Sequence, residues 1–333
     1  MKKSYELDMC NGPILGKILV FAIPLMISGI LQLLFNAADI IVVGRFTGSQ
    51  ALAAVGSTSA LINLIINLFI GVSVGANVVV ARNYGAKDYD GIHGAVHTSV
   101  LTAIWGGIIL IFVGILLARP MLEMMGTPED VINLSVLYMR IYFVGMPAFM
   151  MYNFGAAILR AIGDTKRPLY FLTLSGVVNV VLNLFFVIVF HMGVAGVALA
   201  TIISQAISAF LIILCLMKMD GPCHLDFKHL KFHPEQLKSM LRIGLPAGLQ
   251  GAIFSISNVL IQSSVNSFGS QVMAGNTAAG NIEGFVYNSM NAVYQTSLSF
   301  TSQNMGAKKF DRINKILFQC LLVVTAIGLV MGG

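Results

Sequence analysis

The stretch FAIPLMISGILQLLFNAADIIVV, residues 21–43, decides the fold class. It contains a single charged side chain, that of Asp39. A run of this length exceeds the ~20 residues that an α-helix needs to cross ~30 Å of hydrocarbon. Because lipid offers backbone amides no hydrogen-bond partner, the segment must be helical in order to cross the bilayer. The stretch therefore predicts a transmembrane helix that carries one carboxylate.

The rest of the chain has the same character. Of 333 residues, 57% are hydrophobic and 10% are charged, whereas a soluble domain has about 25% charged residues. We therefore expect an all-α polytopic membrane protein. The nine expected spans are residues 18–43, 52–80, 95–118, 132–157, 168–190, 193–217, 241–265, 274–300 and 316–333. The residues before the first span are too polar for a removed signal peptide, so we expect that span to be retained.

The basic residues fall on one side of the predicted membrane. With a cytoplasmic N-terminus, seventeen of the twenty Lys and Arg residues lie in inner segments, and only Arg45, Arg119 and Arg140 lie elsewhere. This asymmetry follows the positive-inside rule and predicts a multi-pass protein of the inner (plasma) membrane. The net charge of +6 is then a consequence of topology. Since the charges lie in separate short loops, they do not form the basic patch of a nucleic-acid-binding protein.

A later stretch, LRIGLPAGLQGAIFSISNVLIQSSVNSFGSQVMAGN (residues 241–276), repeats the pattern of residues 21–56. Pro24 matches Pro246 at an offset of 222, and Lys87 matches Lys308 at an offset of 221 within a shared Gly-Ala-Lys tripeptide. Six predicted spans separate equivalent positions, and because six is even, both copies enter the membrane from the same side. We expect a parallel tandem repeat of six-helix bundles, a design that places a substrate site between the bundles.

The second copy contains only three of the expected spans. The expected domains are residues 1–220 as an N-terminal six-helix lobe, 221–240 as a cytoplasmic inter-lobe loop and 241–333 as a partial C-terminal lobe. About nine of twelve transmembrane helices would then be present, so we expect a truncated or partial chain.

Polar residues of the first span share one helical face, because they are three or four residues apart. They are Ser28, Gln32, Asn36 and Asp39. A charge at the bilayer centre costs ~2.5–3.5 kcal/mol even on the mildest scale, so a carboxylate in a span is by default functional. The alternative is that Asp39, near the outer end, only pairs with a neighbouring donor. Pro24 and Pro246 lack a backbone donor and are expected to kink their helices.

The fifth and sixth spans provide polar partners for Asp39. Ser175, Asn179 and Asn183 recur at steps of four along the fifth span, and Thr201 lies on a polar face of the sixth. One carboxylate with amide and hydroxyl oxygens can hold Na⁺, or can form a polar site in which the carboxyl group binds a proton. Alternatively, these residues only join helices by hydrogen bonds, which average ~0.6 kcal/mol in membranes.

The second copy carries its membrane carboxylate at a different position. Asp39 corresponds to Ile261, and the acidic residue is Glu283 in the eighth span. Glu283 would attract a cationic substrate in the cleft between the lobes, or it would be a buried acid with a structural donor. The residues expected in the substrate cleft are Glu283, Gln32, Asn36 and Tyr138.

Several segments together resemble the multidrug and toxic compound extrusion (MATE) family, and the resemblance extends over essentially the whole chain. Besides Pro24 and the two Gly-Ala-Lys loops, they are FNAADIIVVGR (35–45), LRAIGDTKRP (159–168), NVVLNLFF (179–186) and GVAGVALAT (193–201). The resemblance implies a twelve-helix, two-lobed antiporter that exports cationic or amphipathic compounds in exchange for Na⁺ or H⁺.

The resemblance also implies a cation site in the N-terminal lobe. Prokaryotic members use an acid in the first helix, an Asn in the fifth and a Thr in the sixth, matched here by Asp39, Asn179 and Thr201. The family commonly has Asp four residues after that Asn, where this chain has Asn183. The difference removes a charge, which weakens Na⁺ binding and favours proton exchange.

The expected partners follow from this assignment. We expect a small organic cation or amphipathic substrate, a lipid bilayer, a monomer, no cofactor besides the coupling ion and no metal other than Na⁺ at Asp39. The alternative is a flippase or exporter of a lipid-linked precursor, but that function requires a strongly basic cleft, and only Arg140 lies in mid-span. An enzyme is disfavoured, because the spans contain neither two facing Asp residues nor a Ser–His pair at membrane depth.

Overall fold

The structure, a computed structural model, describes residues 5–266 and 270–332. Within these ranges the chain forms helices and loops without a strand, as an all-α membrane protein should. The elements are α1 (Ile14–Phe46), α2 (Ser49–Ala86), α3 (Tyr89–Met124), α4 (Glu129–Val144), α5 (Met146–Ala161), α6 (Lys166–Leu184), the π-helix η1 (Phe185–Val189), α7 (Gly193–Lys218), the 3₁₀-helix η2 (Phe227–His229), α8 (Pro234–Asn266), α9 (Ser270–Gly306) and α10 (Phe310–Gly332).

The expected spans fall on these helices. The fourth consists of α4 and α5, which meet at an angle of 49°, because Pro147 in the first turn of α5 lacks the N–H that would continue α4. Among the described residues, six helices are long and apolar enough to cross a membrane, or seven if α4 and α5 form one span. α8 and α9, with 33 and 37 residues, are long enough but more polar, and they are not among the seven.

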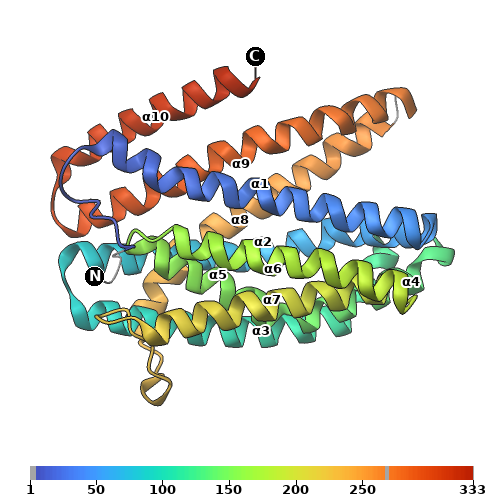
Figure 1. Ribbon diagram of the computed structural model, residues 1–333, viewed down its shortest axis with the longest axis horizontal. Helices are drawn as coiled ribbons and strands as arrows, with labels where there is room; N and C mark the ends of the chain where they lie inside the picture. Colours follow the sequence, from blue (N-terminus) through green and yellow to red (C-terminus); the bar gives the residue numbers. More distant parts are fainter. Residues whose placement is uncertain (1–4, 267–269, 333) are drawn as a thin grey trace.

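The helices form two groups with separate cores (Figure 1). α2 to α7 surround the larger core, while α1, α9 and α10 enclose a smaller one that includes an edge-to-face pair of Phe21 and Phe300. α1 packs against α6 on one side and against α9 on another. This helix therefore bridges the two groups.

α2 packs against α9 and thereby joins the two groups, as α1 does through α6, and α8 packs mainly against α2. α1 and α8 each contain 33 residues. Pro24 and Pro246 lie inside these two helices, which run through the prolines without a break. The kinks at the two prolines therefore remain a prediction.

α2 and α9 end in the same kind of turn. Lys87 and Lys308 have φ angles of 58° and 57°, in the left-handed region that residues other than glycine seldom adopt. Their N–H groups donate to the carbonyl oxygens of Tyr84 and Met305, both at 3.1 Å. The next N–H in each turn reaches back five residues, at 3.0 and 2.9 Å, which completes a Schellman motif. The shared Gly-Ala-Lys tripeptide thus adopts one conformation at two places 221 residues apart.

α2 and α8 touch through glycines. A Cβ atom on Gly71 would lie 2.2 Å from the backbone N of Gly248, and one on Gly75 would lie 2.2 Å from the carbonyl O of Met240. Gly71 and Gly75, like Gly244 and Gly248, are four residues apart, the spacing that lets membrane helices approach closely. Backbone contact therefore holds α8 against α2 of the larger group.

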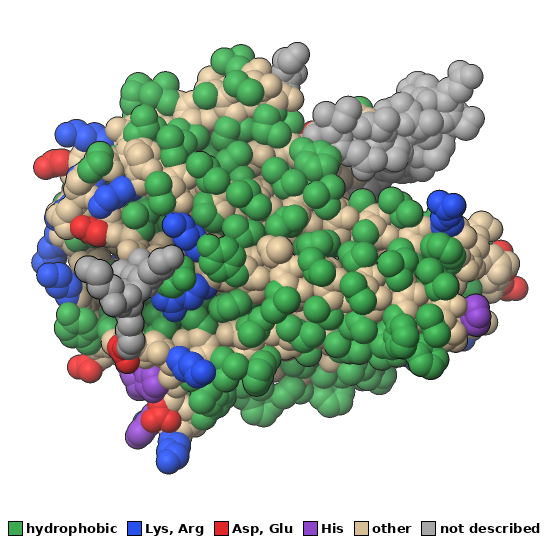
Figure 2. Space-filling view, in the orientation of Figure 1, with side chains coloured by type: hydrophobic (Ala, Val, Ile, Leu, Met, Phe, Trp, Pro, Cys, Tyr) green, Lys and Arg blue, Asp and Glu red, His purple; other side chains and the backbone are tan. Residues whose placement is uncertain are grey.

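Hydrophobic side chains cover the lateral surface of the molecule, as Figure 2 shows. Lys and Arg side chains gather mainly at the end where the N-terminus lies, which is also the end of the Gly-Ala-Lys turns. An apolar belt with a basic end is the distribution expected of a membrane protein whose basic end is cytoplasmic.

Replacing Gly71 with Ala should destabilise the protein, because the new methyl group would meet backbone atoms of α8 that cannot rotate away. We expect a loss of about 1–3 kcal/mol, the usual cost of overpacking. Gly56→Ala is the matched control on the same helix, since nothing lies within 4 Å of its added Cβ. Thermal unfolding in detergent measures both variants, and equal midpoints for the two would contradict the close contact.

Candidate cation-binding site between α1, α6 and α7

The four residues predicted for the cation site are joined by hydrogen bonds. From α6, the Asn183 amide donates to Oδ1 of Asp39 on α1 and, at 3.3 Å, to Oδ1 of Asn179. The Asn179 amide donates in turn to Oγ1 of Thr201 on α7, at 3.5 Å. The structure thus brings the four side chains together where α1, α6 and α7 meet.

The network leaves an oxygen atom without a donor. Asn183 uses its amide hydrogens on Asp39 and Asn179, and its Oδ1 is buried with no hydrogen-bond partner among the described residues. The Thr201 hydroxyl donates to the carbonyl O of Val197 at 3.0 Å, so Thr201 offers the site only acceptor capacity. Buried polar atoms are nearly always paired. An unpaired amide oxygen beside a carboxylate therefore suits a proton or a small cation.

The site is buried on the α6 side and accessible on the α1 side. Asn183 is fully buried and Asn179 is 6% exposed, whereas Asp39 and Thr201 are partly exposed. Ser175, the other member of the α6 stripe, donates to the carbonyl O of Leu172 at 3.0 Å and does not join the network. Asp39 and Thr201 therefore keep part of their surface uncovered by the protein.

A purely structural role for Asp39 would also require a hydrogen bond to a neighbouring donor. The bond from Asn183 fits that simpler interpretation as well as it fits an ion site. The unpaired Oδ1 of Asn183 does not fit the structural interpretation. A carboxylate that only stabilises the fold does not require an unpaired hydrogen-bond acceptor beside it, and buried acceptors are nearly always paired. This atom is the feature that favours an ion site.

Tyr138 lies with Asp39. It is 8% exposed on α4, its ring centroid is 6.0 Å from that of Tyr142, and both tyrosines are within electrostatic range of Asp39. Among the described residues, α4 and α9, which carry Tyr138 and Glu283, are not among the helix pairs that pack extensively. Its assignment to the substrate cleft therefore remains a prediction, while its neighbourhood to the carboxylate is a feature of the structure.

Two local features that position the network were absent from the sequence-based expectation. The π-helix η1 begins two residues after Asn183, and such segments are frequent at functional sites because they interrupt the regular α-helical bonding. One turn before Asn179, a Cβ on Gly176 would lie 1.9 Å from the ring of Phe35. The glycine lets α1 approach α6. Its role could not be predicted from the sequence, because Phe35 lies on a helix distant in the chain.

The remaining predicted cleft residues lie on facing stretches of α1 and α9. Gln32, Asn36 and Glu283 are exposed, and no hydrogen bond between described residues joins them. A Cβ on Gly284 would lie 3.8 Å from the Leu33 side chain, so the stretch of α9 that carries Glu283 faces α1. These residues remain candidates for a substrate cleft.

An aromatic pair next to Glu283 was not predicted. Phe254 on α8 and Tyr287 on α9 stack with their centroids 6.1 Å apart and an interplanar angle of 9°. Both rings are half exposed, at 54% and 53%. Tyr287 follows Glu283 by one helical turn, whereas the position of Phe254 beside it depends on how α8 and α9 meet.

Apolar helices in two groups, with an acceptor-rich polar network inside them, define a multi-pass membrane protein of the transporter class. The chain belongs to the MatE family, whose model matches residues 24–185 and 246–332. Members of this family are transporters and not enzymes.

Similar proteins carry related names. The chain is 31% identical over 305 residues to "Probable multidrug resistance protein YoeA" of Bacillus subtilis (strain 168), covering 90% of this chain and 66% of that protein. "Probable multidrug resistance protein YpnP" of the same organism is 29% identical over 306 residues, covering 92% of this chain and 68% of that protein. The chain thus spans about two thirds of the length of these curated relatives.

The fold is also that of solved transporter structures. One is described as "Outward-facing conformation of a multidrug resistance MATE family transporter of the MOP superfamily". It has a TM-score of 0.91 and 26% sequence identity, and the similarity covers 99% of this chain and 73% of that chain.

The Asp39–Asn183 hydrogen bond should appear as an energetic coupling. In the wild-type background, Asn183→Leu leaves the Asp39 carboxylate without its hydrogen-bond donor. In an Asp39→Leu background, the same substitution removes no hydrogen bond to position 39. We expect the two costs to differ by about 1.5–3 kcal/mol, the strength of a hydrogen bond to a charged group. Chemical unfolding of the four proteins in detergent measures the difference.

Asn153→Leu serves as the control in the same cycle. Its amide donates to Phe149 O within α5 at 2.8 Å and makes no bond to Asp39. It should show no coupling to Asp39→Leu. A coupling for Asn183 that is no larger than that for Asn153 would refute the network.

Proposed function

We propose that this protein is a secondary active antiporter that exports small organic cations or amphipathic compounds in exchange for H⁺ or Na⁺. The observation that carries the proposal is the unpaired Asn183 oxygen beside Asp39, on the helix that packs against both groups of the fold. The names of the relatives as multidrug resistance proteins support the substrate class.

The chemistry of the network suits one monovalent cation. Asp39 is the carboxylate of the network, and Asn183 is neutral where related proteins commonly have Asp. A single positive charge therefore neutralises the site, whereas a divalent ion would leave a net charge in a poorly solvated environment.

A proton fits the unpaired oxygen with little rearrangement. A protonated Asp39 carboxyl becomes a donor, and rotation of the Asn183 amide would present Oδ1 to it. For Na⁺, the same rotation would turn Oδ1 toward the ion as a ligand. The absence of a second carboxylate at position 183 favours H⁺ between the two.

Ion binding would act on transport through α1. In the ion-free network, Asn183 donates to Asp39 and holds α1 against α6. A proton or Na⁺ on Asp39 competes with this donation, so the ion has different affinities for states in which α1 is held or released. Such a difference is the requirement for an ion to shift a conformational equilibrium. We propose that the shift exchanges outward-open and inward-open arrangements of the two helix groups.

The substrate would bind between α1 and the outer stretches of α8 and α9. Glu283 supplies a negative charge there, and the stacked rings of Phe254 and Tyr287 offer aromatic faces to an organic cation. Gln32 and Asn36 line the facing side of α1. A site with one carboxylate and aromatic surface suits amphipathic cations of various shapes.

We further propose that the stretches α1–α7 and α8–α10 derive from a parallel tandem repeat. The two stretches matched by the family model, the equal lengths of α1 and α8, and the shared turns at Lys87 and Lys308 support this relation. In the repeat, α8 is the equivalent of α1, and α9 is the equivalent of α2. The contact between α1 and α9 is then equivalent to the contact between α8 and α2, and both occur in the structure. The proposed protein is a monomer in the plasma membrane, with the basic end and the N-terminus in the cytoplasm.

Asp39→Asn should abolish ion-driven efflux by the full-length protein while leaving insertion intact, because the amide can neither bind a proton nor neutralise Na⁺. Efflux of several fluorescent organic cations from vesicles is measured with an imposed H⁺ gradient and, separately, an imposed Na⁺ gradient. Asn183→Asp is the informative second variant: a second carboxylate should raise the response to Na⁺ relative to H⁺.

Glu123→Gln is the matched control for loss of a carboxylate. Glu123 pairs with Arg119 at 2.8 Å, both side chains being more than half exposed, outside the network. It should transport like the wild type. Efflux by Asp39→Asn at the wild-type rate under both gradients would exclude Asp39 as the coupling residue.

A further inference from the structure

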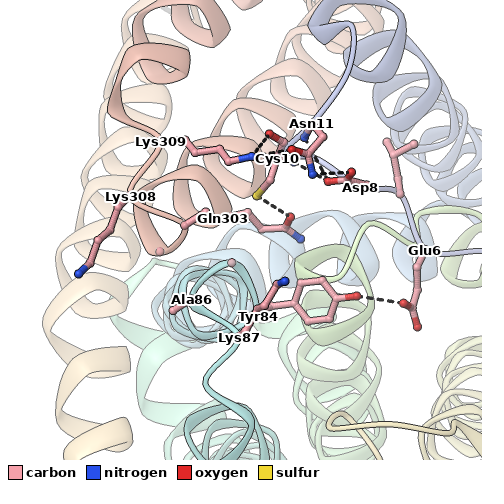
Figure 3. Close-up of a pocket in the computed structure, with 14 residues that line it drawn as sticks. Glu6, Asp8, Cys10, Asn11, Tyr84, Ala86, Lys87, Gln303, Lys308 and Lys309 are labelled. Carbon is pink, nitrogen blue, oxygen red and sulfur yellow. Dashed lines mark hydrogen bonds between the residues drawn. The ribbon is translucent and has the colours of Figure 1, made fainter.

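The segment before α1, residues 5–13, forms a strap across the basic end of the molecule (Figure 3). Met9 at its middle is fully buried in the smaller core, together with Ile18 and Phe300. A segment with a buried anchor, folded locally by hydrogen bonds from the Cys10 and Asn11 N–H groups to Asp8 Oδ1, is a defined part of the fold. We call residues 5–13 the N-terminal strap.

The second half of the strap is bound to α9 and α10. Asn304 donates to the carbonyl O of Met9 at 3.1 Å, and Lys309 donates to Cys10 O at 3.0 Å. Lys309 also donates to Oδ1 of Asn11 at 2.6 Å, and Arg312 donates to Gly12 O at 3.1 Å. Four hydrogen bonds and the buried Met9 tie this half to the smaller group.

The first half of the strap is bound to the larger group. The Tyr84 hydroxyl at the end of α2 donates to Glu6 at 3.0 Å. Arg167 lies over the ring of Tyr5, 4.8 Å from its centroid. A Cβ on Gly163, which has a φ of +96°, would lie 2.5 Å from the backbone N of Leu7. The strap therefore crosses from one helix group to the other.

The loop that receives Tyr5 is rigid. Asp164 is fully buried, pairs with Arg167 at 2.8 Å and accepts the backbone N–H of Lys166 at 3.1 Å. Burial raises the pKa of the Asp164 carboxyl above its usual value, and the Arg167 charge and the backbone donors oppose this shift. A fixed Arg167 gives the strap a defined place to dock.

The two groups meet directly beneath the strap. A Cβ on Gly85 would lie 1.9 Å from Gln303 O, and a Cβ on Gly306 would lie 1.9 Å from Arg82 O. Gln303 lies three residues before Gly306, and Arg82 lies three residues before Gly85. The two contacts are therefore reciprocal, as a two-fold axis would make them. The strap arches over a cavity of about 780 Å³ beside this contact.

We propose that the N-terminal strap is a latch that holds the basic, cytoplasmic end closed. Its first half detaches from Tyr84, Arg167 and Gly163 when the two groups separate there, while its second half stays with α9 and α10. The latch rests on the proposed alternating access, and it adds the element that keeps one of the two gates shut.

The distribution of contacts explains which half detaches. Counting that of the Cys10 thiol to Gln303, the half near α9 and α10 has five hydrogen bonds to described residues of these helices and of the turn between them, and a buried side chain. The other half has one hydrogen bond and one cation–ring contact to the larger group at a partly hydrated surface. The strap also remains joined to α1, because Lys17 donates to Asp8 O and, at 2.7 Å, to Asn11 O. Movement of α1 is therefore transmitted to the strap.

The first test measures opening without measuring transport. Spin labels at Lys87 and Lys308, which are exposed on the two matching turns, report the distance between the groups at this end. Tyr84→Phe should raise the ratio of separated to closed molecules about fivefold, because it removes one ordinary hydrogen bond from the closed state alone. Tyr5→Ala should have a similar effect. Tyr89→Phe, exposed at the same end with no hydrogen bond to another described residue, should have none.

The second test locks the latch. In a chain whose native cysteines are replaced by Ala, a short bifunctional thiol reagent joins Glu6→Cys to Tyr84→Cys across the groups. The matched control keeps Cys10, replaces the other native cysteines by Ala, and joins Cys10 to Gln303→Cys within one group, where the two wild-type side chains are 3.8 Å apart. The first cross-link should stop separation of the spin labels and efflux, with recovery after reduction, and the second should do neither.

The outcomes separate the latch from the transport function. Unchanged distances in Tyr84→Phe and Tyr5→Ala, or label separation in the Glu6–Tyr84 cross-linked chain equal to that of the free chain, would refute the latch. Absence of efflux by the wild-type chain, with the expected distance changes intact, would instead refute the proposed transport and leave the latch supported.

Discussion

The hydrogen bond between Asn183 and Asp39 fixes the place of α1, and the arrangement of the other helices depends on α1. A carboxylate at membrane depth must find its donor within the protein, because lipid provides none. Only a helix that lies directly against α6 can satisfy it, and the contact of Phe35 with Gly176 permits that approach. With one face committed to α6, another face of α1 is free to pack on α9.

This position links the candidate ion site to the opposite end of the molecule. α1 is one continuous helix of 33 residues, about 50 Å long at the usual rise per residue. Asp39 lies near one end, and Lys17 near the other holds the carbonyl groups of the N-terminal strap. A continuous helix with the proposed ion site at one end and the proposed latch at the other is a direct mechanical connection. A displacement of α1 from α6 would therefore be felt at the strap without a chain of intermediate contacts.

The sequence was sufficient for the helical fold and for the members of the network. Long apolar runs predict helices wherever lipid is the solvent, and Asp39, Asn179, Asn183 and Thr201 stand out because they are polar within such runs. Features that arise from packing between distant helices could not be predicted in this way. The π-helix after Leu184, the pairing of Phe254 with Tyr287 and the reciprocal contacts of Gly85 and Gly306 all depend on neighbours that the local sequence does not specify.

Under the proposed repeat, the two copies share their scaffold and differ in their chemistry. The Gly-Ala-Lys turns and the central prolines occur in both, so the scaffold imposes them twice. The polar face of α1 is not repeated: at an offset of 222, Gln32 corresponds to Phe254 and Asp39 to Ile261. A scaffold that folds with Ile at one of two equivalent positions has no structural need for Asp at the other. The cost of a carboxylate at this position is then met only in the first copy, where we propose that it binds the ion, while the second copy carries Glu283 and aromatic residues at other positions, which we propose face the substrate.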